Sequence, residues 1–454
     1  MKNAVNRSCL LFALLLLPFT GNSGPTTNAF TEWATQDYLL GDWGGARSAL
    51  SKHGADFEFF YIGSLPSNLG GGIKTGSAYQ GAIAATLDLD SEKLLGYAGG
   101  TFHISGLWLH GQKLFSANYS GDYNRVNLVD LDNAFRCWEI FYRQKFFSDK
   151  LSLKLGRLSI DSDFIAPEYF TCFGQFSLLN QTFAYPSLPF NVYSAPGFPA
   201  SPHGLAAMPI ATPGAVFAWN PAPQFTLQAG IYSGSPDRSY SGTRWPISQH
   251  DGALNYFEAA WRHNPGTNNP HLGGTLKVGG YYHTSDFTDA YDGVFYAAGL
   301  NPAPSQHSGN YAGYLIAEHQ LFLENGKADP AQQGLVGFFR ALAAPADRSL
   351  TQLELDGGFV YRGLIPTRDW DSLAVAFSYL GFSDDLRRAQ QDINALAPGS
   401  FVPVDYENVV EVNYRAQLTA WWTLQGSFQH VFHPGGSAAL PDANVFILQT
   451  TLRF

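Results

Sequence analysis

The chain has 454 residues, of which 45% are hydrophobic, 15% aromatic and only 14% charged. Soluble domains carry about 25% charged residues, so this composition favours a protein whose outer surface need not face water. The net charge of −10 argues against nucleic acid as a partner, because such binding requires a basic face. Past residue 30 no apolar run approaches the roughly 20 residues of a membrane helix, which leaves an all-β membrane protein or a large secreted β-protein.

The N-terminus has the pattern of a secretory signal peptide. Lys2 and Arg7 precede an apolar run over residues 9–17, and small polar residues follow. We assign residues 1–29 to this signal, with cleavage after either Ser23 or Ala29, and expect export to an oxidising compartment.

Residues 30–54 are predicted to form a periplasmic segment with one short helix. The spacing of apolar residues favours an amphipathic helix over residues 43–53, and Gly54 would end it. We expect this helix to cap the first strand rather than to bind a ligand.

From residue 55 onward the hydrophobic period changes to two, which predicts sixteen strands. Most are long enough to cross a bilayer at a tilt, and the even number fits a membrane barrel over residues 55–454. The predicted strands are 55–65, 77–90, 98–110, 131–147, 150–160, 213–220, 224–233, 252–263, 272–284, 309–323, 332–343, 351–362, 371–381, 402–418, 419–433 and 443–454.

The connections between these strands alternate in length, as expected for short periplasmic turns and long external loops. The short ones include 148–150, 220–224, 264–271 and 325–331, whereas the long ones include 111–130, 161–212, 234–251, 285–308 and 382–401. One external connection, 344–349, is short.

The third external loop, residues 161–212, is the longest connection. It contains ten Phe or Tyr and seven Pro but no Lys or Arg, so it is too proline-rich for an inner strand and too apolar for a solvated linker. We predict that it folds into the barrel and narrows it. Asp161 and Asp163 are expected to anchor its start by pairing with arginines of the wall, and its aromatic rings are expected mainly to pack.

The last strands indicate which side chains face the lumen and which face lipid. Over 419–433, Trp422, Leu424 and Phe428 alternate with polar Gln425 and Gln429. A soluble sandwich would also alternate. Charge on the polar faces, with Trp or Tyr ending the apolar faces, favours a wet lumen inside a lipid-facing wall.

Several stretches resemble the carbohydrate-selective outer-membrane porins of the OprB type. They include LLGDWGGARSALSKHG at 39–54, LKLGRLSIDSDF at 153–164 and YRAQLTAWWTLQGSFQHVFHPGG at 414–436. The resemblance covers nearly the whole mature chain. It implies a Gram-negative outer-membrane channel for passive diffusion of small sugars, and a homo-oligomer, expected to be a trimer. One departure is Gln425, Gly426 and Ser427, where the family usually has Gln-Pro-Asp.

A sugar channel needs polar side chains for hydroxyl groups, and arginine suits this role because its planar fork donates two bonds. Each candidate has the alternative of only solvating the lumen or pairing with a neighbour. With Asp161 and Asp163 on the loop, the pore-lining candidates are Glu139, Arg143, Arg157, Glu318, Arg340, Glu354, Arg362, Glu411, Arg415, Gln425 and Gln429.

Other features of the mature chain are Cys137, Cys172 and the terminal Phe454. The two cysteines either form a disulfide or remain buried thiols, and the sequence leaves both open. Phe454 ends an amphipathic strand, a signal that barrel assembly machinery reads. There is no CxxC or His/Cys cluster, and no catalytic motif, so neither a metal, a cofactor nor an enzyme is predicted.

Two alternatives remain at this stage. One is a general or anion-preferring porin of the same architecture. The other is a secreted or outer-membrane glycoside hydrolase that uses paired carboxylates, such as Glu354 with Asp356 or Asp384 with Asp385. The sequence does not specify which sugar would pass.

Overall fold

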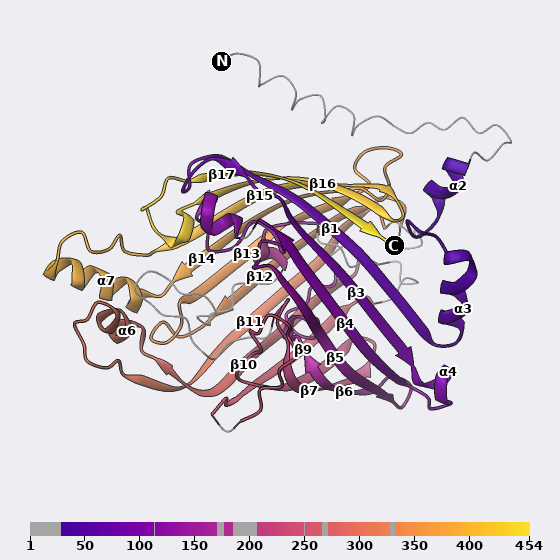
Figure 1. Ribbon diagram of the computed structural model, residues 1–454, viewed down its shortest axis with the longest axis horizontal. Coiled ribbons are helices and arrows are strands. Elements are labelled where there is room, and N and C mark those ends of the chain that lie inside the picture. The colour runs from indigo at the N-terminus through magenta and orange to yellow at the C-terminus, as the bar shows by residue number, and fades with distance from the viewer. Residues whose placement is uncertain are drawn as a thin grey trace, which may run out of the picture.

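The first and last strands pair with each other and close the sheet into a barrel (Figure 1). In this computed structural model β1 (Ala55–Gly70) runs antiparallel to β17 (Ala443–Arg453), with Phe60 opposite Arg453 and Ser64 opposite Gln449. The described residues are 29–112, 114–169, 177–184, 207–248, 250–265, 271–326 and 332–454.

The sheet contains 17 strands, of which β2 has two residues, so the sixteen predicted strands are confirmed. Each long strand is antiparallel to its neighbours in sequence. Between the closing pair lie β2 (Gly76–Ser77), β3 (Gln80–Asp90), β4 (Gly100–Gly111), β5 (Ala134–Phe146), β6 (Leu151–Leu158), β7 (Thr212–Ala222), β8 (Phe225–Ser233), β9 (Ala253–His263), β10 (Gly274–Thr288), β11 (Gln306–Leu323), β12 (Gly334–Ala343), β13 (Thr351–Arg362), β14 (Ser372–Phe382), β15 (Tyr406–Thr419) and β16 (Trp422–Phe432).

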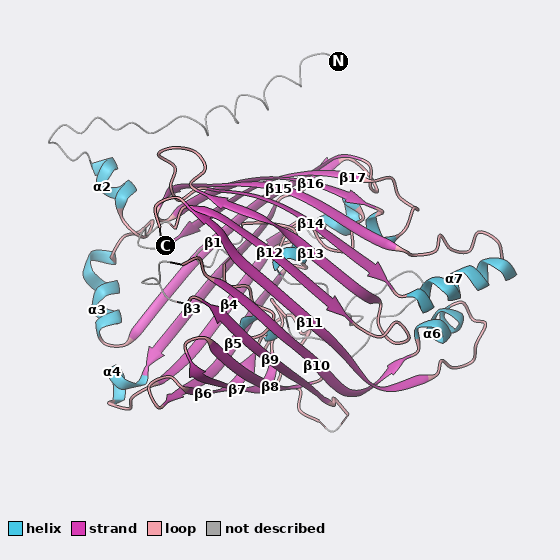
Figure 2. Cartoon of the chain, turned by 180° about the vertical axis from the view of Figure 1, so that it is seen from behind, coloured by secondary structure: helices cyan, strands magenta, loops and turns pink. Residues whose placement is uncertain are grey.

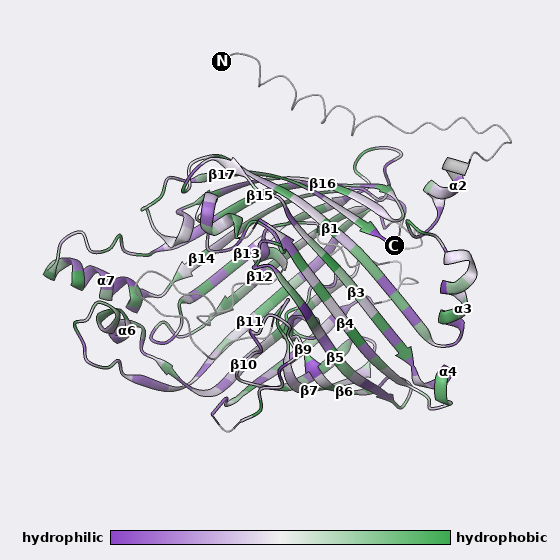
Figure 3. Ribbon diagram, in the orientation of Figure 1, coloured by the Kyte–Doolittle hydropathy of each residue, from purple (hydrophilic) through white to green (hydrophobic). Residues whose placement is uncertain are grey.

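Side chains alternate between a lipid-facing and a lumen-facing side along each strand. In β16, Thr423, Gln425 and Gln429 are buried towards the interior, whereas Phe428 is exposed on the outside. Figure 3 shows this alternation as bands of hydrophobic and hydrophilic residues along the strands. The facing predicted from the sequence is therefore confirmed for this strand.

Helices gather at the two ends of the barrel (Figures 1 and 2). At the end that carries the C-terminus lie α2 (Ala29–Thr35), α3 (Ala46–Lys52) and α4 (Ser91–Leu95), and at the opposite end lie α6 (Ala290–Ala297) and α7 (Asp384–Leu396). Short turns of helix are η1 (Trp43–Gly45), η2 (Ser116–Ser120), η3 (Ile160–Ser162), α5 (Gln181–Ala184) and η5 (Pro434–Gly436). Within the described ranges, no helix combines the length and the apolar character needed to cross a membrane.

The helix predicted over residues 43–53 is shorter than expected. Gly44 and Gly45 have φ values of 67° and 95°, so a 3-10 turn precedes α3 and the regular helix begins at Ala46. Glycine adopts these left-handed conformations without the steric penalty of a side chain. The sequence did not predict α2, α6 or α7.

The N-terminal segment holds the barrel seam at the end that carries the C-terminus (Figure 1). The backbone N–H of Leu39 donates to the carbonyl of Arg453 at 2.8 Å, and the Arg47 guanidinium donates to the carbonyls of Phe57, at 2.7 Å, and Phe454. Arg47 also lies over the ring of Tyr38, 3.8 Å from its centroid. One cation therefore joins the first strand, the last residue and the N-terminal segment.

Replacing Arg47 with alanine should weaken the seam. Each of its two hydrogen bonds, from a charged donor, contributes about 2 kcal/mol, so we expect the free energy of unfolding to fall by roughly 4 kcal/mol. Samples are heated before a denaturing gel, and the measurement is the temperature at which the fast-migrating folded barrel converts to the slower unfolded form. Lys52→Ala, which removes an exposed cation from the same segment, is the control, and an equal effect of both variants would contradict this role.

Candidate functional site

The loop between β6 and β7, residues 159–211, is here called L3, and the parts of it that the structure describes lie against the inner wall. Its described parts are residues 159–169, 177–184 and 207–211. Phe164 is fully buried and packs against Tyr232 and Tyr256, with ring centroids 6.4 and 5.1 Å away. The predicted inward fold of this loop is confirmed, and the ring of Phe164 serves packing, as expected.

Buried glutamates of the wall bind the backbone of L3. An irregular loop inside a barrel leaves N–H groups without sheet partners, and a carboxylate has enough acceptor sites for two of them. Glu139 on β5 accepts from Ser159 at 2.9 Å, Glu258 on β9 from Ile165 at 3.1 Å, Glu318 on β11 from Glu168 at 2.7 Å and Tyr169 at 2.8 Å, and Glu411 on β15 from Leu179 at 2.7 Å and Asn180 at 2.8 Å.

The second part of L3 is held through Thr182. Its hydroxyl donates to Glu354 at 2.7 Å, and its carbonyl accepts from Arg340, which also forms an ion pair of 2.8 Å with Asp356. All four side chains are buried. Glu354 and Arg340, predicted to line the pore, thus support the loop that narrows it.

Gln429 extends the same support beneath the loop. It accepts a hydrogen bond from the Asn180 side chain at 3.1 Å and donates to Glu411 at 3.2 Å and to the carbonyl of Val126 at 2.9 Å. Val126 belongs to the second external loop, so Gln429 joins both loops to the wall.

Partly exposed ion pairs line the lumen side of the first part of L3. Glu168 pairs with Arg262 through two hydrogen bonds of 2.8 and 2.9 Å and with Lys277 at 3.0 Å. Asp163 pairs with Lys154 at 2.9 Å. Burial raises the pKa of Glu168, but its bonds to Arg262 and Lys277 outweigh this and leave the pKa below its ordinary value.

Asp161 ties the two ends of L3 together. It accepts hydrogen bonds from the Ser159 hydroxyl and from the backbone N–H of Met208, the latter at 3.0 Å. Burial raises the pKa of Asp161 to about 6. The predicted anchoring of the loop start by two aspartates is found, but the partners differ: Asp163 binds Lys154, and Asp161 binds groups of the loop.

The register places Arg157 on the outward side of β6. It stands opposite Ile140 and Pro213 and shares its side of the strand with Leu155, which is 46% exposed. Asp237, in the loop over residues 234–252 that we call L4, forms a 3.3 Å ion pair with Arg157 and covers it. Arg157 therefore differs from the sequence prediction, because it faces L4 rather than the lumen.

The remaining candidates lie in the lumen wall. Arg143 and Arg362 are half-buried, and Arg415 is buried and donates to Gln417 at 2.6 Å. Gln425 is buried and donates to Asn413 at 3.4 Å. Contact of these side chains with a permeant stays a prediction.

Of the two cysteines that either form a disulfide or remain thiols, Cys172 lies outside the described residues, as do Phe170, Phe173 and Phe176 of L3. Cys137 is half-buried, and its backbone N–H donates to the carbonyl of Ser241 in L4 at 2.9 Å.

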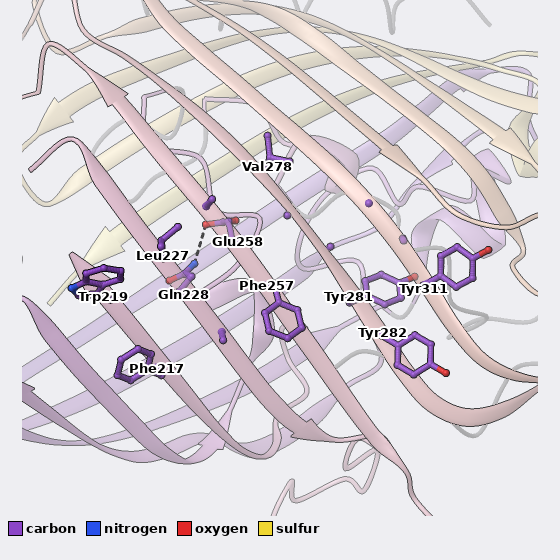
Figure 4. A pocket seen from close by; sticks show the side chains of 16 residues that line it. Phe217, Trp219, Leu227, Gln228, Phe257, Glu258, Val278, Tyr281, Tyr282 and Tyr311 are labelled. Atoms are coloured by element: carbon purple, nitrogen blue, oxygen red, sulfur yellow. Dashed lines mark hydrogen bonds between the residues drawn. The ribbon is translucent and has the colours of Figure 1, made fainter. Parts of the chain in front are cut away.

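Sequence reasoning missed Glu258 and Arg262. Both stand at even positions of β9, on the same side as buried Tyr256, so inward alternation already pointed to them. Figure 4 shows Glu258 beside Gln228 of the neighbouring strand, which donates to it at 2.9 Å.

The groove drawn in Figure 4, of about 730 Å³, lies on the outer wall over β7 to β11. Exposed Phe217, Trp219, Leu227 and Phe257 line it, and its floor includes Gly279. These apolar side chains face lipid, so the groove is not part of the permeation path.

Comparison with known families decides the class of this barrel. The model of the family described as carbohydrate-selective porin, OprB family, matches residues 74–454. The chain belongs to this family. It is therefore a carbohydrate-selective channel of a Gram-negative outer membrane and not an enzyme. The glycoside hydrolase alternative is wrong, and its buried pair of Glu354 and Asp356 instead holds Thr182 and Arg340.

Individual relatives agree with the family over almost their full length. Porin B of Pseudomonas aeruginosa is 26% identical over 458 residues, which cover 96% of this chain and 94% of Porin B. A putative porin, QuiX, of Acinetobacter baylyi is 23% identical and covers 92% of this chain and 93% of QuiX. The high-pH structure of Pseudomonas putida OprB has the same fold, with a TM-score of 0.78, 24% identity and coverage of 93% and 99% of the two chains.

Removing a wall carboxylate should loosen L3. In Glu318→Ala two backbone N–H groups of L3, those of Glu168 and Tyr169, lose their acceptor, and each lost hydrogen bond contributes about 1 kcal/mol. We expect a larger single-channel conductance and a higher size limit for permeating sugars. Glu92→Ala, at an exposed periplasmic glutamate, is the control, and unchanged conductance in Glu318→Ala would contradict the anchoring role.

The raised pKa of Asp161 predicts a pH dependence. Its contribution to stability is fully present below the ordinary pKa of 3.8 and is lost as the pH rises through about 6, because the ionised form is buried. Asp161→Asn should therefore gain in unfolding temperature relative to the parent between pH 4 and pH 8. Asp56→Asn, at an exposed aspartate, is the control, and a gain that shrinks with rising pH would refute the assignment.

Proposed function

We propose that the channel passes small neutral sugars and that the lumen side of L3 supplies its selectivity. This proposal rests on the balance of charge on the lumen side of L3. Three cations, Lys154, Arg262 and Lys277, pair with the carboxylates of Asp163 and Glu168. The carboxylate of Glu139 lies 3.8 Å from Lys154. Paired donors and acceptors suit hydroxyl groups, which both give and accept hydrogen bonds.

Partial exposure supports weak and reversible contacts. Side chains of Arg262, Glu168 and Asp163 keep 28%, 25% and 18% of their surface, so a sugar can exchange hydrogen bonds with them without breaking the ion pairs. Conduction requires contacts that are favourable enough for entry and weak enough for release.

A sugar-blocking series tests this assignment. Arg262→Gln should weaken the block of channel conductance by a hexose roughly tenfold, because one charge-assisted hydrogen bond is lost. Lys145→Gln, at a periplasmic lysine paired with Asp149, is the control. If the hexose blocks Arg262→Gln as strongly as the parent, the lumen side of L3 does not supply the selectivity. If liposomes that contain the parent protein do not swell in sugar, the channel does not pass sugars.

The alternative of a general or anion-preferring porin makes a different prediction. A balanced set of charges gives no strong preference for either ion, whereas an anion channel needs a net positive constriction. A reversal potential near zero in a salt gradient, combined with block by sugars, supports the sugar channel. A strong anion preference without sugar block supports the alternative.

We further propose that the signal peptide is cleaved after Ser23 or Ala29, and that the mature protein forms a homo-oligomer, expected to be a trimer, in outer-membrane lipid. The terminal Phe454 would first be read by the barrel assembly machinery. In the closed barrel its backbone N–H donates to the carbonyl of Phe59 at 2.8 Å across the seam.

A further inference from the structure

The described part of L4 (residues 234–248 and 250–252) is fixed to Arg157, which stands on the outward side of the barrel wall. The ion pair of Arg157 and Asp237 is almost fully buried, and Arg136 donates to the carbonyl of Asp237 at 3.2 Å. Ser241 accepts the backbone N–H of Cys137 where β5 diverges from β6. Because Arg157 stands in the outward row of β6, the loop that covers it lies beside lipid at the external rim.

Beyond these anchors, L4 exposes large apolar side chains. Tyr240, Trp245 and Ile247 are 65%, 51% and 74% exposed. Side chains of this size on an external loop are costly in water, whereas Tyr and Trp favour a membrane interface. On the outer wall itself, Phe217 and its neighbours form an exposed apolar surface (Figure 4).

Two exposed arginines, Arg238 and Arg244, accompany these apolar residues. The backbone N–H of Arg244 donates to Asp237 at 2.8 Å, which fixes the position of Arg244 next to the anchor. An arginine fork binds phosphate oxygens well, and phosphates mark the headgroups of the outer leaflet.

We propose that L4 binds a phosphorylated glycolipid of the outer leaflet. Tyr240, Trp245 and Ile247 enter its acyl region, and Arg238 and Arg244 bind its phosphates. The combination of apolar and cationic groups matches one amphipathic, anionic molecule. This site lies on the opposite side of the wall from the permeation path.

Binding of a lipid A preparation to the purified full-length protein in detergent tests the proposal, with retained lipid counted by native mass spectrometry. Arg238→Gln with Arg244→Gln should weaken binding at least tenfold, and Trp245→Ser should weaken it independently. The parent should bind chemically dephosphorylated lipid A at least tenfold more weakly. Arg388→Gln, at an exposed arginine of α7, is the matched control, and unchanged conductance shows that each variant is folded.

Three results would overturn the proposal. One is equal binding of lipid A by the double variant and the parent. Another is equal binding of phosphorylated and dephosphorylated lipid by the parent. The third is loss of oligomers in the double variant with lipid binding unchanged, which would assign this surface to a second copy of the chain.

Discussion

The structure depends on the hydrogen bonds between buried wall carboxylates and the backbone amides of L3. A loop without regular structure can occupy the interior of a barrel only where its polar groups find partners. Glu139, Glu258, Glu318 and Glu411 provide them from four strands spread around the wall. The bore of the channel therefore depends on residues that need not touch the permeant.

The residues that hold L3 in place therefore differ from those that can contact the permeant. The most deeply buried charges, such as Glu411 and the pair of Arg340 and Asp356, are committed to the loop and to each other. The charges that remain partly exposed, such as Arg262 and Glu168, are held by ion pairs and still present donors and acceptors to the lumen. Removing a supporting residue should change the bore, whereas removing an exposed one should change affinity.

Two arginines join distant parts of the chain at the two ends of the barrel. Arg47 joins the seam at the end that carries the C-terminus, and Arg157 fixes L4 at the external end. Each cation is held by backbone or loop groups that are distant in sequence. Arg157 thus has a different role from the pore-lining one that the sequence predicts, and the role of Arg47 at the seam is visible only in the structure.

The sequence by itself determined the sixteen strands, their two faces and the inward course of L3, because a period of two and a proline-rich aromatic loop are local properties. It also identified Glu139, Glu318, Glu354 and Glu411 as inward residues, but not what they bind. Only the tertiary structure decided their loop partners and the outward position of Arg157. The reason is physical: those contacts join segments distant in sequence, and a shift of one residue in register exchanges the faces of a strand.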